Sequence, residues 1–152
     1  MLLRQIPLGA FLLSSFISTG AMAQTTRNVN FPLIGLGTSQ TAQITVANLA
    51  SASSSGTAAS CAGTISFLNS AGTAIGTATS FTLASGAISS ATLPFAKAGA
   101  TGSHTVVRGL IVLTVTSGVP CQLDSLLEVY DTASGVDART SDGGSLSTGG
   151  GH

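Results

Sequence analysis

Cys61 and Cys121 are the two cysteines of this 152-residue chain, and their number limits which disulfide or metal site they could form. Two cysteines allow one intramolecular bond, so we predict a Cys61–Cys121 disulfide. In the chain-entropy model, a cross-link between positions about 60 residues apart is worth on the order of 4 kcal/mol. The alternative is a metal site built on two free thiols, which no His or Cys spacing supports. With no Cys-x-x-Cys motif and no neighbouring cation, we expect a structural bond without redox activity.

Histidine is the most common general base in enzymes, and the chain has two, His104 and His152. His104 precedes a long apolar segment and His152 ends a Gly/Ser-rich stretch, so they suggest no catalytic triad. No Gly-x-Ser-x-Gly motif joins a strand to a helix. The glycine-rich stretches lack the Lys of a phosphate-binding loop. We therefore predict no catalytic residue, no cofactor and no enzymatic activity.

All five acidic residues lie between Asp124 and Asp142, where Arg139 is the only cation. Clustered carboxylates can bind Ca²⁺, but Asp124 and Glu128 would lie about 13 Å apart along one strand. We therefore expect no metal site, and instead solvated side chains, with Asp131 capping a turn. Calcium binding by residues 124–142 is the alternative.

The elements that would position these residues are short segments rich in Val, Ile, Thr and Phe, separated by Gly and Ser. Their alternation of apolar and polar residues is typical of half-buried strands. Pro32 places the first strand at a sheet edge. Seven strands and a short eighth are predicted, at residues 29–36, 41–49, 64–69, 75–83, 87–95, 106–116, 121–130 and 136–140. The short Gly-bearing links at residues 70–72 and 84–86 predict hairpins between the strands that they join.

The segment 106–116 is almost continuously apolar, so we expect a central strand that is covered on both faces. Arg108 is its one charged residue. A cation in such a strand either pairs with an acid, for which Glu128 is the candidate, or points to solvent.

Two sheets packed face to face are the simplest way for many short amphipathic strands to bury their apolar sides. We therefore predict an all-β fold over residues 24–140, a two-sheet antiparallel β-sandwich of about seven to eight strands. Residues 50–60 and 141–152 consist mainly of small and polar residues. They predict a mobile loop and a disordered Gly/Ser tail, respectively.

Residues 1–23 have the order of a cleavable signal peptide, with Arg4, an apolar run and then small residues. Ala21 and Ala23 suit a signal peptidase, so we predict a mature chain that begins at Gln24. The apolar run is shorter than the roughly 20 residues needed to span a bilayer, and no later segment is suitable. We expect an exported protein, periplasmic or extracellular, without a transmembrane segment after cleavage. Such compartments favour disulfides.

The chain after residue 23 carries four cations and five acids, a net charge of −1. Charged residues make up 7% of the whole sequence, well below the usual quarter. Nucleic-acid binding requires a basic surface, so we expect no nucleic-acid partner. The surface should be neutral and rich in hydroxyl groups, and its partner is an unknown surface, protein or glycan.

Four segments carry a resemblance to a known family: GTSQT at 37–41, SFLNSAG at 66–72, FTLASG at 81–86 and LLEVYD at 126–131. In their layout they resemble the small immunoglobulin-like β-sandwich domains of secreted bacterial proteins. The resemblance implies an immunoglobulin-like sandwich and supplies no catalytic residues.

We therefore expect a secreted, non-enzymatic β-sandwich module with a structural or binding role in the periplasm or at the cell exterior. The alternative is a self-assembling surface or pilus-type subunit, because exported donor-strand pilins are similar in size, composition and single disulfide. A hydrolase is a third class, which the missing acid–base pair disfavours.

Overall fold

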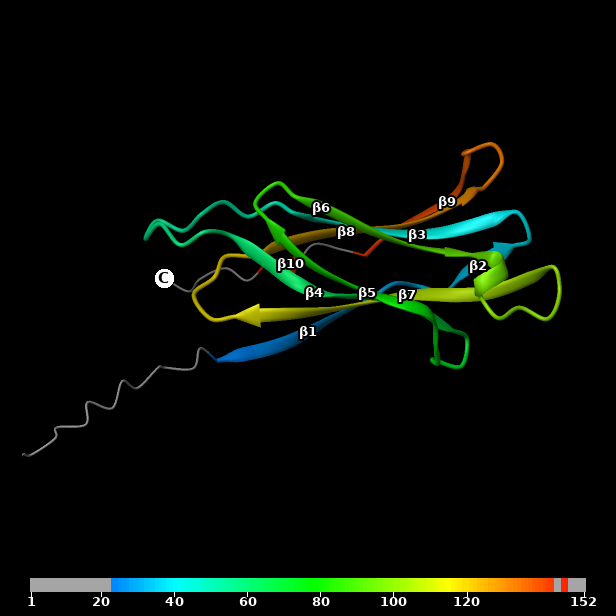
Figure 1. The fold of residues 1–152 in the computed structure, drawn as a ribbon, viewed down its shortest axis with the longest axis horizontal. Coiled ribbons are helices and arrows are strands. Elements are labelled where there is room, and N and C mark those ends of the chain that lie inside the picture. The colour runs from blue at the N-terminus through cyan, green and yellow to red at the C-terminus, as the bar shows by residue number, and fades with distance from the viewer. Residues whose placement is uncertain (1–22, 144–145, 148–152) are drawn as a thin grey trace, which may run out of the picture.

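A computed structural model describes residues 23–143 and 146–147, which form two antiparallel five-stranded sheets packed face to face (Figure 1). Sheet A contains β1 (Gln24–Asn30), β2 (Ile34–Gly37), β4 (Ser60–Asn69), β5 (Ala74–Ala84) and β7 (His104–Thr116). Sheet B contains β3 (Gln40–Asn48), β6 (Ile88–Pro94), β8 (Gln122–Asp131), β9 (Asp137–Asp142) and β10 (Leu146–Ser147). The predicted all-β, two-sheet sandwich is confirmed.

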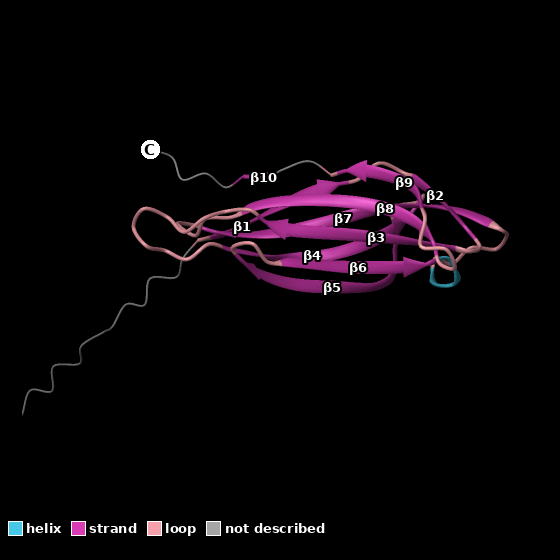
Figure 2. Cartoon of the chain, turned by 90° about the horizontal axis from the view of Figure 1, so that it is seen from above, coloured by secondary structure: helices cyan, strands magenta, loops and turns pink. Residues whose placement is uncertain are grey.

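Each sheet is four strand positions wide, because two strands share one position at its edge. In sheet A, β1 and β2 pair with successive parts of β7, followed by β4 and β5. In sheet B, β9 and β10 pair with successive parts of β8, followed by β3 and β6. Viewed from above, β5 and β6 lie along one long side of the sandwich, and β9 and β10 lie along the other (Figure 2).

The core lies between the sheets and is built by alternation along the strands. On β3 and β8, for example, every second residue is buried, because neighbouring side chains of a strand point to opposite faces. The large apolar side chains that are completely or almost completely buried come from both sheets: Leu36, Ile44, Ile65, Leu93, Ile111, Leu113, Leu123 and Leu127.

The prediction that 106–116 is covered on both faces was wrong. β7 is a central strand, and its residues Val107, Ile111 and Leu113 are completely buried against sheet B. Its alternate residues, such as Leu110 and Val112, are only half-buried on the outer face of sheet A. Apolar and β-branched residues suit a central strand even without a covering layer, because side chains on adjacent strands partly shield them.

The N-terminal strand lies at an edge, as Pro32 predicted, but it is interrupted. Residues 31–33 separate β1 from β2, and Phe31 is buried in the core. The break lets both strands follow β7 while Phe31 turns inward. With β10 added, the described residues contain ten strands, compared with the seven or eight expected.

Residues 84–86 join β5 to β6, but not as the hairpin that their short Gly-bearing sequence predicted. β5 pairs with β4 in sheet A, whereas β6 pairs with β3 in sheet B, so the chain crosses between sheets here. The crossing is held by Asn48, whose N–H donates to Ala87 O and whose carbonyl accepts from Gly86 N, at 3.0 and 2.7 Å. The preceding turn at residues 70–73 does form the expected hairpin, between β4 and β5.

The predicted C-terminal tail differs from expectation where the structure describes it. Residues 141 and 142 belong to β9, and residues 146 and 147 form β10; both strands pair with β8. Residues 144–145 and 148–152 lie outside the described residues, as does the predicted signal peptide up to residue 22. The only helix among the described residues is η1 (Phe95–Lys97), so no described helix could cross a membrane.

Candidate functional site

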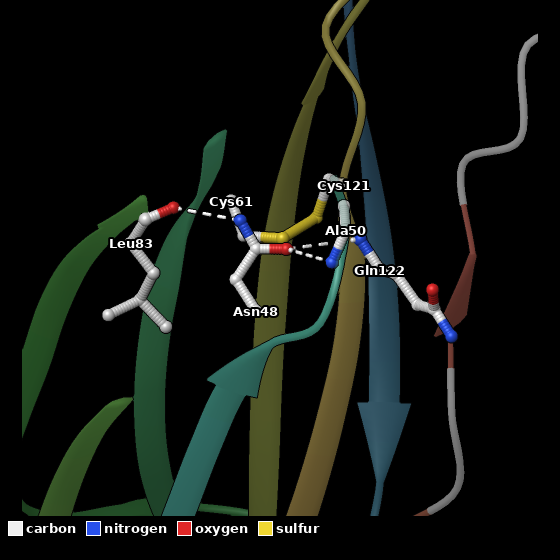
Figure 3. Close-up of a disulfide and its surroundings, with 6 residues drawn as sticks. All are labelled: Asn48, Ala50, Cys61, Leu83, Cys121 and Gln122. Atoms are coloured by element: carbon white, nitrogen blue, oxygen red, sulfur yellow. Dashed lines mark hydrogen bonds between the residues drawn. A yellow bond between two sulfur atoms is a disulfide. The ribbon is translucent and has the colours of Figure 1, made fainter. Parts of the chain in front are cut away.

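The two cysteines form the predicted disulfide, with their Cα atoms 5.1 Å apart (Figure 3). Cys61 lies on β4 of sheet A, and Cys121 lies directly before β8 of sheet B. Both are buried. The bond therefore links the two sheets covalently.

Asn48, at the end of β3, makes a second link between the sheets beside the disulfide (Figure 3). Its side chain is completely buried. Its Nδ2 donates to the carbonyl of Leu83 on β5 at 3.0 Å. Its Oδ1 accepts from the backbone N of Ala50 at 3.0 Å and of Gln122 at 3.4 Å. The sequence did not point to this residue, because an Asn at a strand end resembles an ordinary turn residue.

The two histidines are not brought together among the described residues. His104 is exposed at the start of β7, where it pairs with Gly37 of β2. His152 lies outside the described residues. Within residues 23–143 and 146–147, no group of three or more His, Cys, Asp or Glu residues is arranged to hold a metal ion.

Asp131 caps the turn after β8, as predicted. Its Oδ1 accepts hydrogen bonds from the backbone N of Ala133 at 3.0 Å and of Ser134 at 2.9 Å, and from the Ser134 hydroxyl at 3.0 Å. A hydrogen bond from the Ser39 side chain and those from Ser134 lower the pKa of Asp131 from 3.8 to about 2. The carboxylate thus joins this turn to the turn between β2 and β3.

The suggested pair of Arg108 and Glu128 does not form. Arg108 lies on β7 of sheet A and Glu128 on β8 of sheet B, and both are on the outer faces of their sheets. Glu128 Oε1 instead accepts from Gln43 Nε2 at 2.9 Å. The Arg108 guanidinium lies beside Gly72, and its Nε has no hydrogen-bond partner among the described residues. Alternation along a strand predicts whether a residue points to the inner or the outer face of its sheet, but not which of the two sheets the strand belongs to.

A groove of about 440 Å³ opens between β5 and β6, where the two sheets end side by side. Ala91 and Leu93 contribute buried apolar side chains to it. The other lining residues are polar, small or at the rim: Gly76, Thr77, Thr79, Ser90, Thr92, Pro94 and Lys97.

A bulge in β5 shapes this groove. Ile65 pairs with Thr79 and Phe67 pairs with Ile75, so two steps along β4 correspond to four along β5. Gly76 lies within the bulge with φ of +68°, a conformation that glycine adopts without strain. A Cβ atom at Gly76 would lie 3.0 Å from Leu93 Cδ1, so a larger residue here would also require the Leu93 side chain to shift.

The groove lies between two unpaired strand edges. β5 pairs only with β4, and β6 pairs only with β3, so each presents backbone N–H and C=O groups on its free side. Neither strand contains a charged residue. Lys97 is the one charged residue among the lining residues, and it is exposed just beyond β6. This arrangement suits binding through hydrogen bonds, shallow apolar contact and one ammonium group.

The sequence predicted both strands but not the groove between them. The hydroxyl residues at 77, 79, 90 and 92 were visible as strand residues. Their convergence depends on β5 and β6 being edge strands of different sheets, which the expected β5–β6 hairpin would have precluded. No family model matches the sequence, and searches of curated proteins and of solved structures find no match.

Proposed function

We propose that this protein is an exported, non-enzymatic β-sandwich module with a structural or binding role, and that the groove between β5 and β6 is its contact surface. The observation that carries the proposal is the groove itself. It combines hydroxyl groups, unpaired strand edges and Lys97 on a surface that otherwise has few charges. Such a lining favours an uncharged or weakly acidic partner, either protein or glycan.

The rigidity of the groove supports a binding role. Its β6 wall pairs with β3 along seven residues, and its β5 wall is tied to sheet B through Asn48 and Leu83. A preformed site loses less conformational entropy when it binds than a flexible loop does.

The binding role is tested with glycan and extended-peptide arrays, using the protein recovered after export from a bacterial host. Thr92→Lys places a long cation in the groove at an exposed position of β6. Thr38→Lys is the matched control, because Thr38 is exposed in the turn between β2 and β3 and does not line the groove. Binding should fall about tenfold or more in Thr92→Lys and stay unchanged in Thr38→Lys. Equal binding by both variants and the unmodified protein would refute the assigned surface.

Export is tested by the intact mass of the protein from that host. The mass should equal that of residues 24–152 less two hydrogens, because the leader is removed and the disulfide is closed. Retention of residues 1–23 would contradict the export proposal without affecting the assignment of the groove.

A further inference from the structure

We propose that the partner of the groove is a second copy of this chain, added head to tail so that both sheets continue from one molecule into the next. The β5/β6 side of one copy would meet the β1/β9 side of its neighbour. This inference rests on the proposed function, because it uses the same groove as the contact surface.

The strand directions permit this contact in both sheets at once. Every neighbouring pair within the two sheets is antiparallel, and each sheet has four strand positions. With an even number of positions, the two edges of a sheet run in opposite directions. A copy added along the sheets, and turned so that it continues their twist, therefore places β1 antiparallel to β5, and β9 antiparallel to β6. An odd number would have produced a parallel pair.

The edges also lie on the correct sides of the molecule. β5 and β6 share the groove on one side. On the other side, Phe31, between β1 and β2, closely contacts the position of Gly143, directly after β9. Figure 2 shows the same separation, with β5 and β6 on the long side opposite β9 and β10. One neighbouring copy can therefore reach both edges together.

The registers bring compatible residues to the same level. In sheet B, Pro94 of β6 is aligned through Thr41 and Tyr130 with Asp137 of β9. A copy added in register places its Asp137 beside Pro94 of the first copy, three residues before Lys97. In sheet A, the corresponding row through β4 and β7 aligns Thr82 of β5 with Thr26 of β1.

The charges at the two edges of sheet B are complementary. β5 and β6 have no charged residue, and Lys97 lies three residues beyond the end of β6. At the opposite edge of sheet B, β9 contains Asp137 and Asp142 against Arg139, while Arg27 is the one charged residue of β1 in sheet A. Natural proteins commonly protect free strand edges with charged residues, and the β5/β6 side has none within its strands. A head-to-tail contact of two different surfaces does not close on itself, so it predicts open filaments.

The test measures the association of the full exported protein by sedimentation velocity and by negative-stain electron microscopy. Lys97→Glu and Asp137→Lys should each weaken association about tenfold, because each gives the two edges that meet in sheet B a like charge in place of an opposite one. An equimolar mixture of the two variants should restore it, because each variant then meets the opposite charge on both of its sides. Asp124→Lys is the control, since it makes the same charge change as Asp137→Lys at an exposed outer-face position of β8.

Restoration in the mixture, together with normal association of the control, is the expected result. The self-association proposal is overturned if the unmodified protein remains monomeric at all concentrations, if neither variant weakens association, or if mixing restores nothing. A monomer that loses array binding through Thr92→Lys would refute self-association but leave the proposed function intact. If Thr92→Lys alters neither association nor array binding, the proposed function fails as well.

Discussion

Asn48 contributes more to stability than a typical surface Asn, because its side chain is buried and makes hydrogen bonds to three backbone groups. Asn48→Ala leaves Leu83 O and the backbone N of Ala50 without their partners. We expect the free energy of unfolding to fall by about 2–4 kcal/mol, measured by urea denaturation, because each orphaned buried group costs roughly 1–3 kcal/mol. Asn69→Ala is the control. Its Oδ1 also accepts two backbone hydrogen bonds, but in an exposed turn where water can replace them, and it should cost about 1 kcal/mol or less. Equal losses would contradict this account.

Asp131 makes stability depend on pH in the acid range. Its pKa is about 2 in the folded protein, below the ordinary value of 3.8 that we assign to the unfolded chain, so the folded state favours the charged form. The resulting stabilisation is fully present above about pH 4 and is lost as the pH falls through 2. Asp131→Asn keeps an acceptor oxygen but removes the charge. The urea midpoint of the native protein should exceed that of the variant at pH 7, and the gap should close between about pH 4 and 2. A gap that stays constant down to about pH 2 would show that the carboxylate charge is unimportant.

At the scale of elements, the packing of β7 onto β3 depends on Gly109. A Cβ atom at this position would lie 2.5 Å from Ile44 Cδ1 and 2.8 Å from Phe31 Cδ2. Gly109→Ala should therefore destabilise the protein by about 1–3 kcal/mol through overpacking. Ile44→Val removes the nearer atom, so the double variant should be more stable than the sum of the single losses predicts. Gly102→Ala, which meets nothing within 4 Å, should be close to neutral. Strict additivity of the two core changes would contradict the proposed contact.

At the scale of the whole molecule, the disulfide and Asn48 link the two sheets in the same region of the sandwich (Figure 3). Replacing both cysteines by Ala should lower the free energy of unfolding by about 2–5 kcal/mol. The denaturant midpoint should fall, and the m-value should stay similar or rise, because the unfolded chain becomes less compact. Any binding activity should survive wherever the double variant remains folded, since the groove does not contain the disulfide. Unchanged stability would refute the structural role of the bond.

The sequence by itself determined the secondary structure and much of the core. The alternation of Ile44 and Val46, or of Leu127 and Val129, predicted strands and their buried faces, and these residues are completely buried. This information is local, because the side-chain period of a strand is two whatever its partner. The disulfide could also be predicted, because two cysteines allow only one bond. The capping role of Asp131 could also be predicted, because its hydrogen bonds within the turn reach residues at most three positions away in the sequence.

Only the tertiary structure decided which strands pair and therefore where the groove lies. An alternating strand buries the same face whether its neighbour in space is the next strand of the chain or a distant one. Alternation therefore does not identify the partner of a strand, and the short link between β5 and β6 favoured a hairpin. Their separation into different sheets leaves two unpaired edges beside each other. The sequence also does not say which sheet contains each strand. For this reason Glu128 was a candidate partner of Arg108, and β7 was expected to be covered on both faces, and neither expectation was correct. Sheet membership arises from contacts between residues far apart in the chain, such as Asn48 with Leu83, and periodicity along one strand does not encode them.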